Sequence, residues 1–197
     1  LTATAQASVV LPKKPSGWSF RNHVQPALTR SGCNSGACHG AIAGKNGFKL
    51  ALRGYDDDRD FLAITRHALG RRIRPEDPAH SLLLLKPTGA VPHKGGVRFG
   101  VESAAYRILS DWIASGTPGP KADDPRIERI ELFPAAAVLQ PGDEQPILVR
   151  AHFSDGSARD VTPWAKFTAT DASVAVIADE GLVKVTGPGE GAITAWY

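Results

Sequence analysis

The stretch GCNSGACHG, residues 32–40, holds both cysteines of the 197-residue chain. Four small residues separate Cys33 from Cys38, and His39 follows the second cysteine directly. A disulfide would close a short loop but would give His39 no role. A zinc site would need a fourth ligand that no second cysteine pair supplies, and an iron–sulfur cluster would need four cysteines. The pattern therefore favours covalent haem, because it matches the attachment signal C-x-x-C-H with a wider spacer.

In this interpretation Cys33 and Cys38 form the thioethers of one haem c, and His39 binds its iron from the proximal side. Only the Cys–His adjacency must be kept, so two of the four spacer residues are expected to bulge outward. Covalent haem is assembled outside the cytoplasm. We therefore expect an exported protein, periplasmic or extracellular.

Composition and charge divide the chain. Hydrophobic residues make up 42% and charged residues 22%, which is typical of globular proteins. No apolar run approaches the roughly 20 residues of a membrane span, so no transmembrane segment is expected. Residues 1–120 carry 16 Lys or Arg against 8 Asp or Glu, whereas residues 121–197 carry 7 against 12. The basic half could steer an acidic partner, but its cations are too scattered to indicate nucleic-acid binding.

The stretch GTPGPKADDP, residues 116–125, predicts a linker. Before it, helical periodicity predicts helices over residues 20–28, 56–69, 81–86 and 101–116. After it, alternating residues between turn signals predict an all-β sandwich. We expect a flexible segment over 1–17, a helical domain over 18–115, the linker over 116–125 and a β domain over 126–197.

Three separated blocks carry a resemblance to a known family: FRNHVQPALTRSGCNSGACHGAIAGKNGFKLALRGYD, RRIRPEDPAHSLLLLKPTGAVPHKGGVRF and YRILSDWIASGTPGP. They resemble the planctomycete-type cytochrome c domain, in the subgroup with the C-x4-C-H spacer. The resemblance covers roughly residues 18–120. It implies an all-α class I-like cytochrome c fold with covalent haem at Cys33, Cys38 and His39.

The distal iron ligand departs from the usual class I pattern. Class I cytochromes c usually supply a methionine from a loop before the last helix, but this chain has no methionine. His93 lies in the corresponding loop, so bis-histidine ligation by His39 and His93 is the leading hypothesis, with a lower reduction potential. An open distal position, or His67 or His80 as the ligand, are the alternatives. Four arginines could pair with the haem propionates: Arg71, Arg72, Arg74 and Arg98. For most of them a place on the solvated surface is the plainer interpretation.

Residues 127–197 resemble a bacterial Ig-like domain of group 2, through PGDEQPILVRAHFSDGSARDVT, EGLVKV and the closing AITAWY. This completes the expected fold class: two domains, a class I-like all-α cytochrome c fold followed by an all-β Ig-like sandwich. The family usually has a further strand after AITAWY, so we expect either a truncated domain or a native chain that continues. The β domain would act as a spacer or docking domain.

The leading functional hypothesis is electron transfer rather than catalysis by this chain alone. The expected partner is a redox protein, for instance one with an acidic surface, or a further domain of the same native chain. A haem enzyme such as a peroxidase, or a gas-binding protein, is the alternative and would need an open distal site. An adhesive protein with a structural haem is a third hypothesis.

Overall fold

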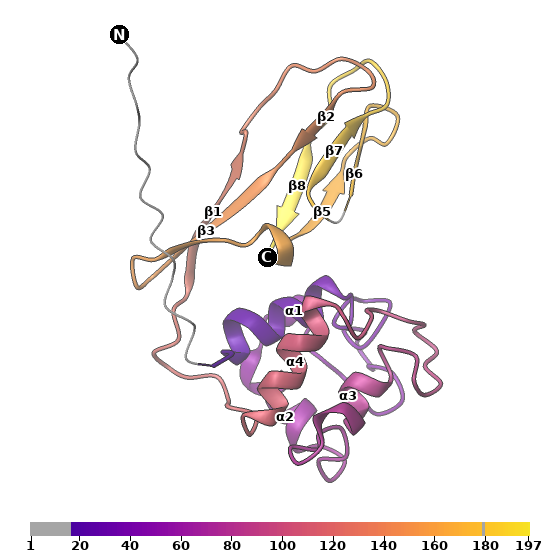
Figure 1. Ribbon diagram of the computed structural model, residues 1–197, viewed down its shortest axis with the longest axis vertical. Helices are drawn as coiled ribbons and strands as arrows, with labels where there is room; N and C mark the ends of the chain where they lie inside the picture. The colour runs from indigo at the N-terminus through magenta and orange to yellow at the C-terminus, as the bar shows by residue number, and fades with distance from the viewer. Residues whose placement is uncertain (1–16, 179) are drawn as a thin grey trace.

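The computed structural model describes residues 17–178 and 180–197 (Figure 1). The N-terminal segment expected over residues 1–17 therefore lies outside the described residues, apart from Gly17. We call residues 18–115 the helical part and residues 126–197 the strand part. Among the described residues, no helix combines the length and apolar character that crossing a membrane requires.

The helical part is built from short segments joined by tight turns. Side chains of Ser19, Asp56 and Ser103 accept hydrogen bonds from backbone N–H groups and so cap three of the helices. The helix expected over 56–69 ends at Thr65, because the chain turns at Ala68 and Leu69, where φ is +56° and +59°. The segments are η1 (Phe20–Val24, a π-helix), α1 (Gln25–Arg30), η2 (Leu52–Gly54), α2 (Asp57–Thr65), η3 (Pro78–His80), α3 (Leu82–Leu85) and α4 (Ala104–Ala114).

Helix α4 provides the main apolar face of the helical part. Its residues Ile108, Leu109, Trp112 and Ile113 are fully buried. The ring of Phe20 from η1 lies 5.6 Å from that of Trp112, so the first and last helices meet in the core. Each large side chain buried in this way contributes roughly 1.5–3 kcal/mol to stability.

The strand part consists of short antiparallel strands. Three sheets have the orders β1-β3-β4, β2-β7-β6 and β5-β8. Alternation is clearest in β3, where Val149, Ala151 and Phe153 are buried and Arg150 between them is exposed. The strands are β1 (Ile127–Phe133), β2 (Glu144–Pro146), β3 (Leu148–Phe153), β4 (Ala158–Asp160), β5 (Lys166–Ala169), β6 (Ala175–Ile177), β7 (Leu182–Val185) and β8 (Ile193–Trp196), with η4 (Thr162–Trp164) between β4 and β5.

The expected fold class is wrong. The structure is a small mixed protein, 24% helical and 20% strand, with antiparallel sheets, and not an all-α class I-like domain followed by an all-β Ig-like sandwich. Periodicity located most of the segments, but it did not report how strands share hydrogen bonds. Here they divide among three small sheets. A 3-10 helix interrupts the strands at Thr162–Trp164, and an isolated β-bridge joins Lys45 to Phe48 in the helical part.

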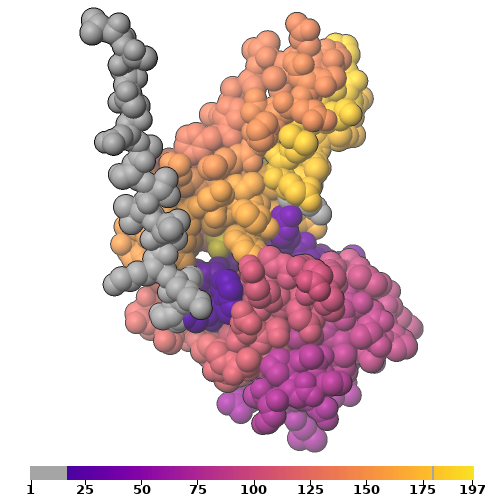
Figure 2. Space-filling model, viewed as in Figure 1, coloured from indigo at the N-terminus to yellow at the C-terminus, as the bar shows by residue number. Residues whose placement is uncertain are grey.

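The two parts touch along η1, α1 and η2, and Figure 2 shows the strand part lying against the helical part. Trp164 packs against the apolar cores of both parts. Polar bonds and one cation–π contact complete the interface. Arg30 Nη1 donates to Ala165 O at 2.5 Å, and Tyr197 Oη donates to Asn22 O at 2.8 Å. Asn22 Nδ2 donates to Pro125 O, at the end of the linker, at 3.0 Å. The cation–π contact places Arg53 over the ring of Trp196 at 5.1 Å.

Candidate functional site

The loop over residues 33–40 is compact and follows directly from α1. The backbone N–H of Cys33 donates to Leu28 O at 2.9 Å, and that of His39 donates to Cys33 O at 3.0 Å. Gly36 and Ala37 in the spacer are exposed, in keeping with the expected outward bulge. Gly40 has no room for a side chain, because a Cβ there would lie 2.0 Å from the carbonyl oxygen of residue 34.

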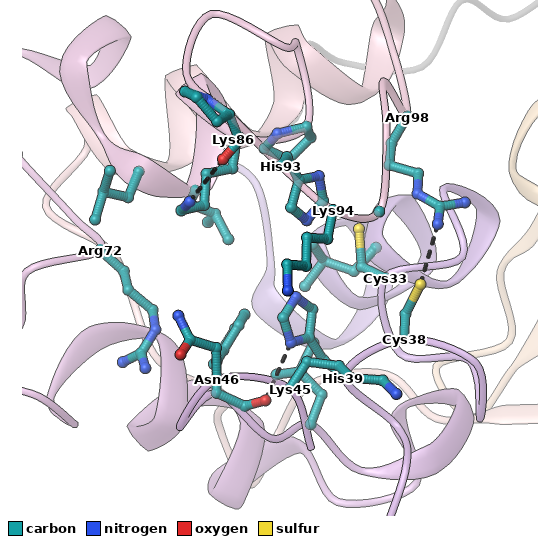
Figure 3. Close-up of a pocket in the computed structure, with 18 of the residues that line it drawn as sticks. Cys33, Cys38, His39, Lys45, Asn46, Arg72, Lys86, His93, Lys94 and Arg98 are labelled. Atoms are coloured by element: carbon teal, nitrogen blue, oxygen red, sulfur yellow. Dashed lines mark hydrogen bonds between the residues drawn. The ribbon is translucent and has the colours of Figure 1, made fainter.

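A cavity of about 1140 Å³ opens beside this loop (Figure 3). The loop supplies both cysteines and His39, and the segment before α4 supplies His93. The structure thus brings all four predicted site residues to one cavity. Apolar side chains line a further part of its wall, chiefly Leu28, Phe48, Leu50, Leu82 and Leu83.

His39 is oriented by the turn that contains Phe48. Its Nδ1 lies 3.0 Å from Phe48 O, and the two rings lie 4.5 Å apart. A carbonyl only accepts, so Nδ1 carries the proton and Nε2 is left with a lone pair. Burial lowers the pKa of His39, and so do, to a lesser extent, nearby cationic groups. His39 is therefore a neutral imidazole, the form that binds a metal.

His93 has the same kind of bond on a more exposed loop. Its Nδ1 lies 2.9 Å from Gly96 O, which again leaves Nε2 as the free nitrogen. Lys86, at the end of α3, donates from Nζ to Pro92 O at 3.0 Å and so holds the residue before His93. Metal-binding histidines characteristically show this bond from the second ring nitrogen.

The two imidazoles lie one above the other at the cavity in Figure 3. Their ring centres are 6.4 Å apart and their planes differ by 11°. Two imidazoles that bind one metal from opposite sides place a nitrogen about 2 Å from it, with each ring centre about 1 Å beyond, so the centres lie roughly 6 Å apart. The observed spacing fits one metal ion between His39 and His93.

The two cysteines beside His39 are free thiols in different surroundings. Cys33 is buried, and desolvation raises its pKa to about 12. Cys38 is half-buried, and its Sγ accepts a hydrogen bond from Arg98 Nη2 at 3.1 Å. Both cysteines line the cavity.

Charges on the cavity wall have one sign. The wall contains six cations and no carboxylate. Arg72 and Arg98 lie on opposite sides of the cavity in Figure 3. Arg74, named with them from the sequence, does not line it. The cations are Lys45, Arg71, Arg72, Lys86, Lys94 and Arg98.

The other histidines of the chain lie elsewhere. His67 and His80, the alternative distal ligands, are exposed and do not line the cavity. His80 pairs with Asp77 at 2.6 Å. Within the described part of the chain, no group of three or more His, Cys, Asp or Glu side chains could hold a metal ion, and such a group is what a zinc site built from protein ligands requires.

Sequence reasoning missed the groups that orient the histidines. The sequence pattern assigned no orienting role to Phe48, and it placed Lys86 only at the end of an expected helix. Phe48 acts through its backbone carbonyl oxygen, and Lys86 acts through a side-chain ammonium that donates to the carbonyl oxygen of Pro92. Every residue possesses such a carbonyl. The available signal was the crowding of Gly and Pro residues in both loops, which marks turns but not their acceptors.

No protein-family model matches the sequence, and no curated protein shows a significant match to it. The chemistry of the cavity is therefore inferred from its own residues.

Proposed function

We propose that the chain is an exported c-type cytochrome that transfers electrons through one covalently held haem. The observation that carries this proposal is the paired geometry of His39 and His93 at a cavity that also contains both cysteines. A haem iron bound there would supply a one-electron ferric–ferrous couple. The size and the apolar walls of the cavity fit a porphyrin, and its cations fit two propionates.

Cys33 and Cys38 hold the group in place. Each thiol adds its sulfur and its hydrogen across one vinyl C=C bond, so a C–S bond forms and no oxidant is consumed. Cys38 directly precedes His39 and Cys33 lies six residues before it, so the two thioethers would hold the porphyrin against that imidazole. Covalent attachment then keeps the group in a cavity that is open to solvent.

His39 and His93 would hold the iron through Nε2, the nitrogen that is left free in each ring. Their Nδ1–H groups stay on Phe48 O and Gly96 O, so neither ring is free to rotate. A haem enzyme or gas-binding protein would need one of these sides open. The presence of His93 opposite His39 supports electron transfer over such an activity.

The cationic wall supports a partner that presents carboxylates. Six cations exceed the two negative charges of a haem's propionates, so a positive potential remains at the cavity. The partner would be a redox protein with an acidic surface or a further domain of the native chain. The strand part would serve as a spacer or docking region.

The test is expression in a host that matures c-type cytochromes, followed by mass spectrometry, a pyridine haemochrome assay and optical spectra of both redox states. We expect a mass increased by one haem and a low-spin ferric spectrum. A colourless protein with the mass of the bare chain would contradict the proposal. A high-spin ferric spectrum, with rapid carbon monoxide binding after reduction, would favour the enzyme or gas-binding alternative.

A further inference from the structure

We propose that Arg72 is the positioning residue of the proximal histidine: it holds the turn 45–48 against the end of α2 and thereby fixes the ring of His39. The consequence of this positioning for electron transfer rests on the proposed function. The positioning itself concerns only the residues of this chain.

Arg72 is a buried cation whose side chain donates hydrogen bonds to backbone carbonyls. It is 5% exposed, and its Nη1 donates to Ala63 O at 3.0 Å and His67 O at 2.9 Å. These two oxygens lie at the carbonyl end of α2, where a cation is favoured. Its Nη2 donates to Gly47 O at 3.2 Å. One guanidinium therefore ties the end of α2 to the turn 45–48.

The same guanidinium packs on Phe48. Its Cζ lies 4.4 Å from the centre of that ring, at a distance typical of a cation–π contact. The ring of Phe48 also contacts His39, at 4.5 Å and an angle of 49°. Phe48 therefore lies between Arg72 and His39, and its position decides where the imidazole rests.

The turn delivers the carbonyl that selects the tautomer. Phe48 O accepts from both Lys45 N at 2.8 Å and His39 Nδ1 at 3.0 Å. A shift of the turn would lengthen the bond to His39 and release its ring. Nε2–H would then compete with Nδ1–H, and the lone pair would no longer face the cavity. Arg72 does not need to touch the iron to control its ligand.

The main chain of Arg72 is also held in place by a hydrogen bond. The carbonyl of Arg72 accepts from Leu83 N at 3.1 Å, so the residue is also tied to α3. Its neighbour Arg71 lines the same cavity but is exposed. Arg71 therefore serves as a matched control for the loss of one positive charge at the cavity.

The experiment compares Arg72→Gln, Arg72→Lys and Arg71→Gln with the unsubstituted chain. In the haem-free protein, ¹⁵N NMR of His39 reports the ratio of Nδ1–H to Nε2–H tautomers. We expect this ratio to fall about fivefold in Arg72→Gln, the size of effect that weakening one neutral hydrogen bond produces. Arg71→Gln should leave it unchanged. The tautomer ratio should fall in Arg72→Lys as it does in Arg72→Gln, because an ammonium cannot bridge the carbonyls of two segments as the planar guanidinium does.

In the haem-loaded protein, electron paramagnetic resonance of the ferric state reports ring orientation. We expect altered low-spin g values in both Arg72 variants and unchanged values in Arg71→Gln. A tautomer ratio and g values in Arg72→Gln that equal those of the unsubstituted chain would overturn the inference. Normal behaviour of Arg72→Lys would also overturn it, because that result would assign Arg72 a charge-only role toward a propionate.

If Arg72→Gln does not fold, Phe48→Leu tests the same link, since it keeps the carbonyl but removes the ring between Arg72 and His39. An unchanged tautomer ratio in that variant would reject the inference. The two proposals fail separately. An unsubstituted chain that takes up no haem refutes the proposed function, while the NMR measurement on the haem-free protein still decides the role of Arg72.

Discussion

The two histidine loops reach the same cavity with different support. His39 lies behind a turn that is held by a buried guanidinium and by the ring of Phe48. His93 lies on a loop held by a half-buried lysine, Lys86, and the acceptor of its own Nδ1 is only three residues away. The comparison teaches that one of two neighbouring imidazoles can be tied to a buried side chain while the other is held only by its own surface loop. We therefore expect the two sides to differ in what they tolerate.

The largest expected effect comes from removing each imidazole. His39→Ala should prevent stable haem loading, since losing even an outer partner of a ligand costs about 10–100-fold in metal affinity. His93→Ala should keep its thioethers and its haem but change from a low-spin to a high-spin ferric spectrum. Haemochrome yield and optical spectra measure the two outcomes. An unchanged low-spin spectrum in His93→Ala would remove His93 from the site.

Paired glycine substitutions sharpen the comparison. Gly44 has a φ of +63°, and a Cβ there would lie 2.5 Å from Phe48 O, so Gly44→Ala should cost about 1–3 kcal/mol of stability. A Cβ on Gly95 would lie 2.8 Å from Cε1 of His93, which is the end of a side chain that can move. Gly95→Ala should leave stability within about 0.5 kcal/mol but raise the high-spin fraction. Urea denaturation and ferric spectra check the pair, and equal destabilisation would break the contrast.

A smaller effect is expected at Lys86. Lys86→Met keeps most of the aliphatic stem but removes the bond to Pro92 O, at a cost of about 0.5–1 kcal/mol. The consequence should be confined to the distal side, as a modest rise in carbon monoxide affinity of the reduced protein. Lys94→Met is the control, because it also removes one cation from the cavity wall. Equal affinities in the two variants would show that charge, and not the loop bond, is responsible.

The smallest expected effect concerns the loss of stability at low pH, at a histidine that lies outside both histidine loops. Burial first, and then repulsion from Arg159, lowers the pKa of His23 below its ordinary value of about 6.5. Between the folded and unfolded pKa values the unfolded chain binds more protons, so this residue makes stability fall as pH drops below about 6.5. His23→Gln should flatten the loss in that window without changing the ferric spectrum. An unchanged slope of unfolding free energy against pH would assign the lability to other groups.

Much of the candidate site could be predicted, because cysteines and histidines are rare and their chemistry is specific. The structure places Cys33, Cys38, His39 and His93 at one cavity, as the sequence predicted. That a haem occupies it stays a prediction. Arg72 was predicted only as one of four cations near a propionate, since no sequence pattern shows which guanidinium is buried under a turn.

The fold could be predicted only at the level of its segments. Alternation indicates that Val149 and Ala151 face inward, but it does not say which strand lies beside β3. The helix expected over 101–116 depends on local periodicity and is present as α4 (Ala104–Ala114), whereas α2 ends early, before a turn with positive φ. Sheet membership depends on contacts between distant residues, and for that reason the expected sandwich was wrong.

All the bonds that orient the two imidazoles end on main-chain carbonyl oxygens, at Phe48 and Gly96. Such an oxygen takes up no proton at any pH at which the protein is folded, unlike an aspartate in the same place. When the site accepts an electron, these two oxygens should therefore take up no proton. They should contribute nothing to the change of the midpoint potential with pH.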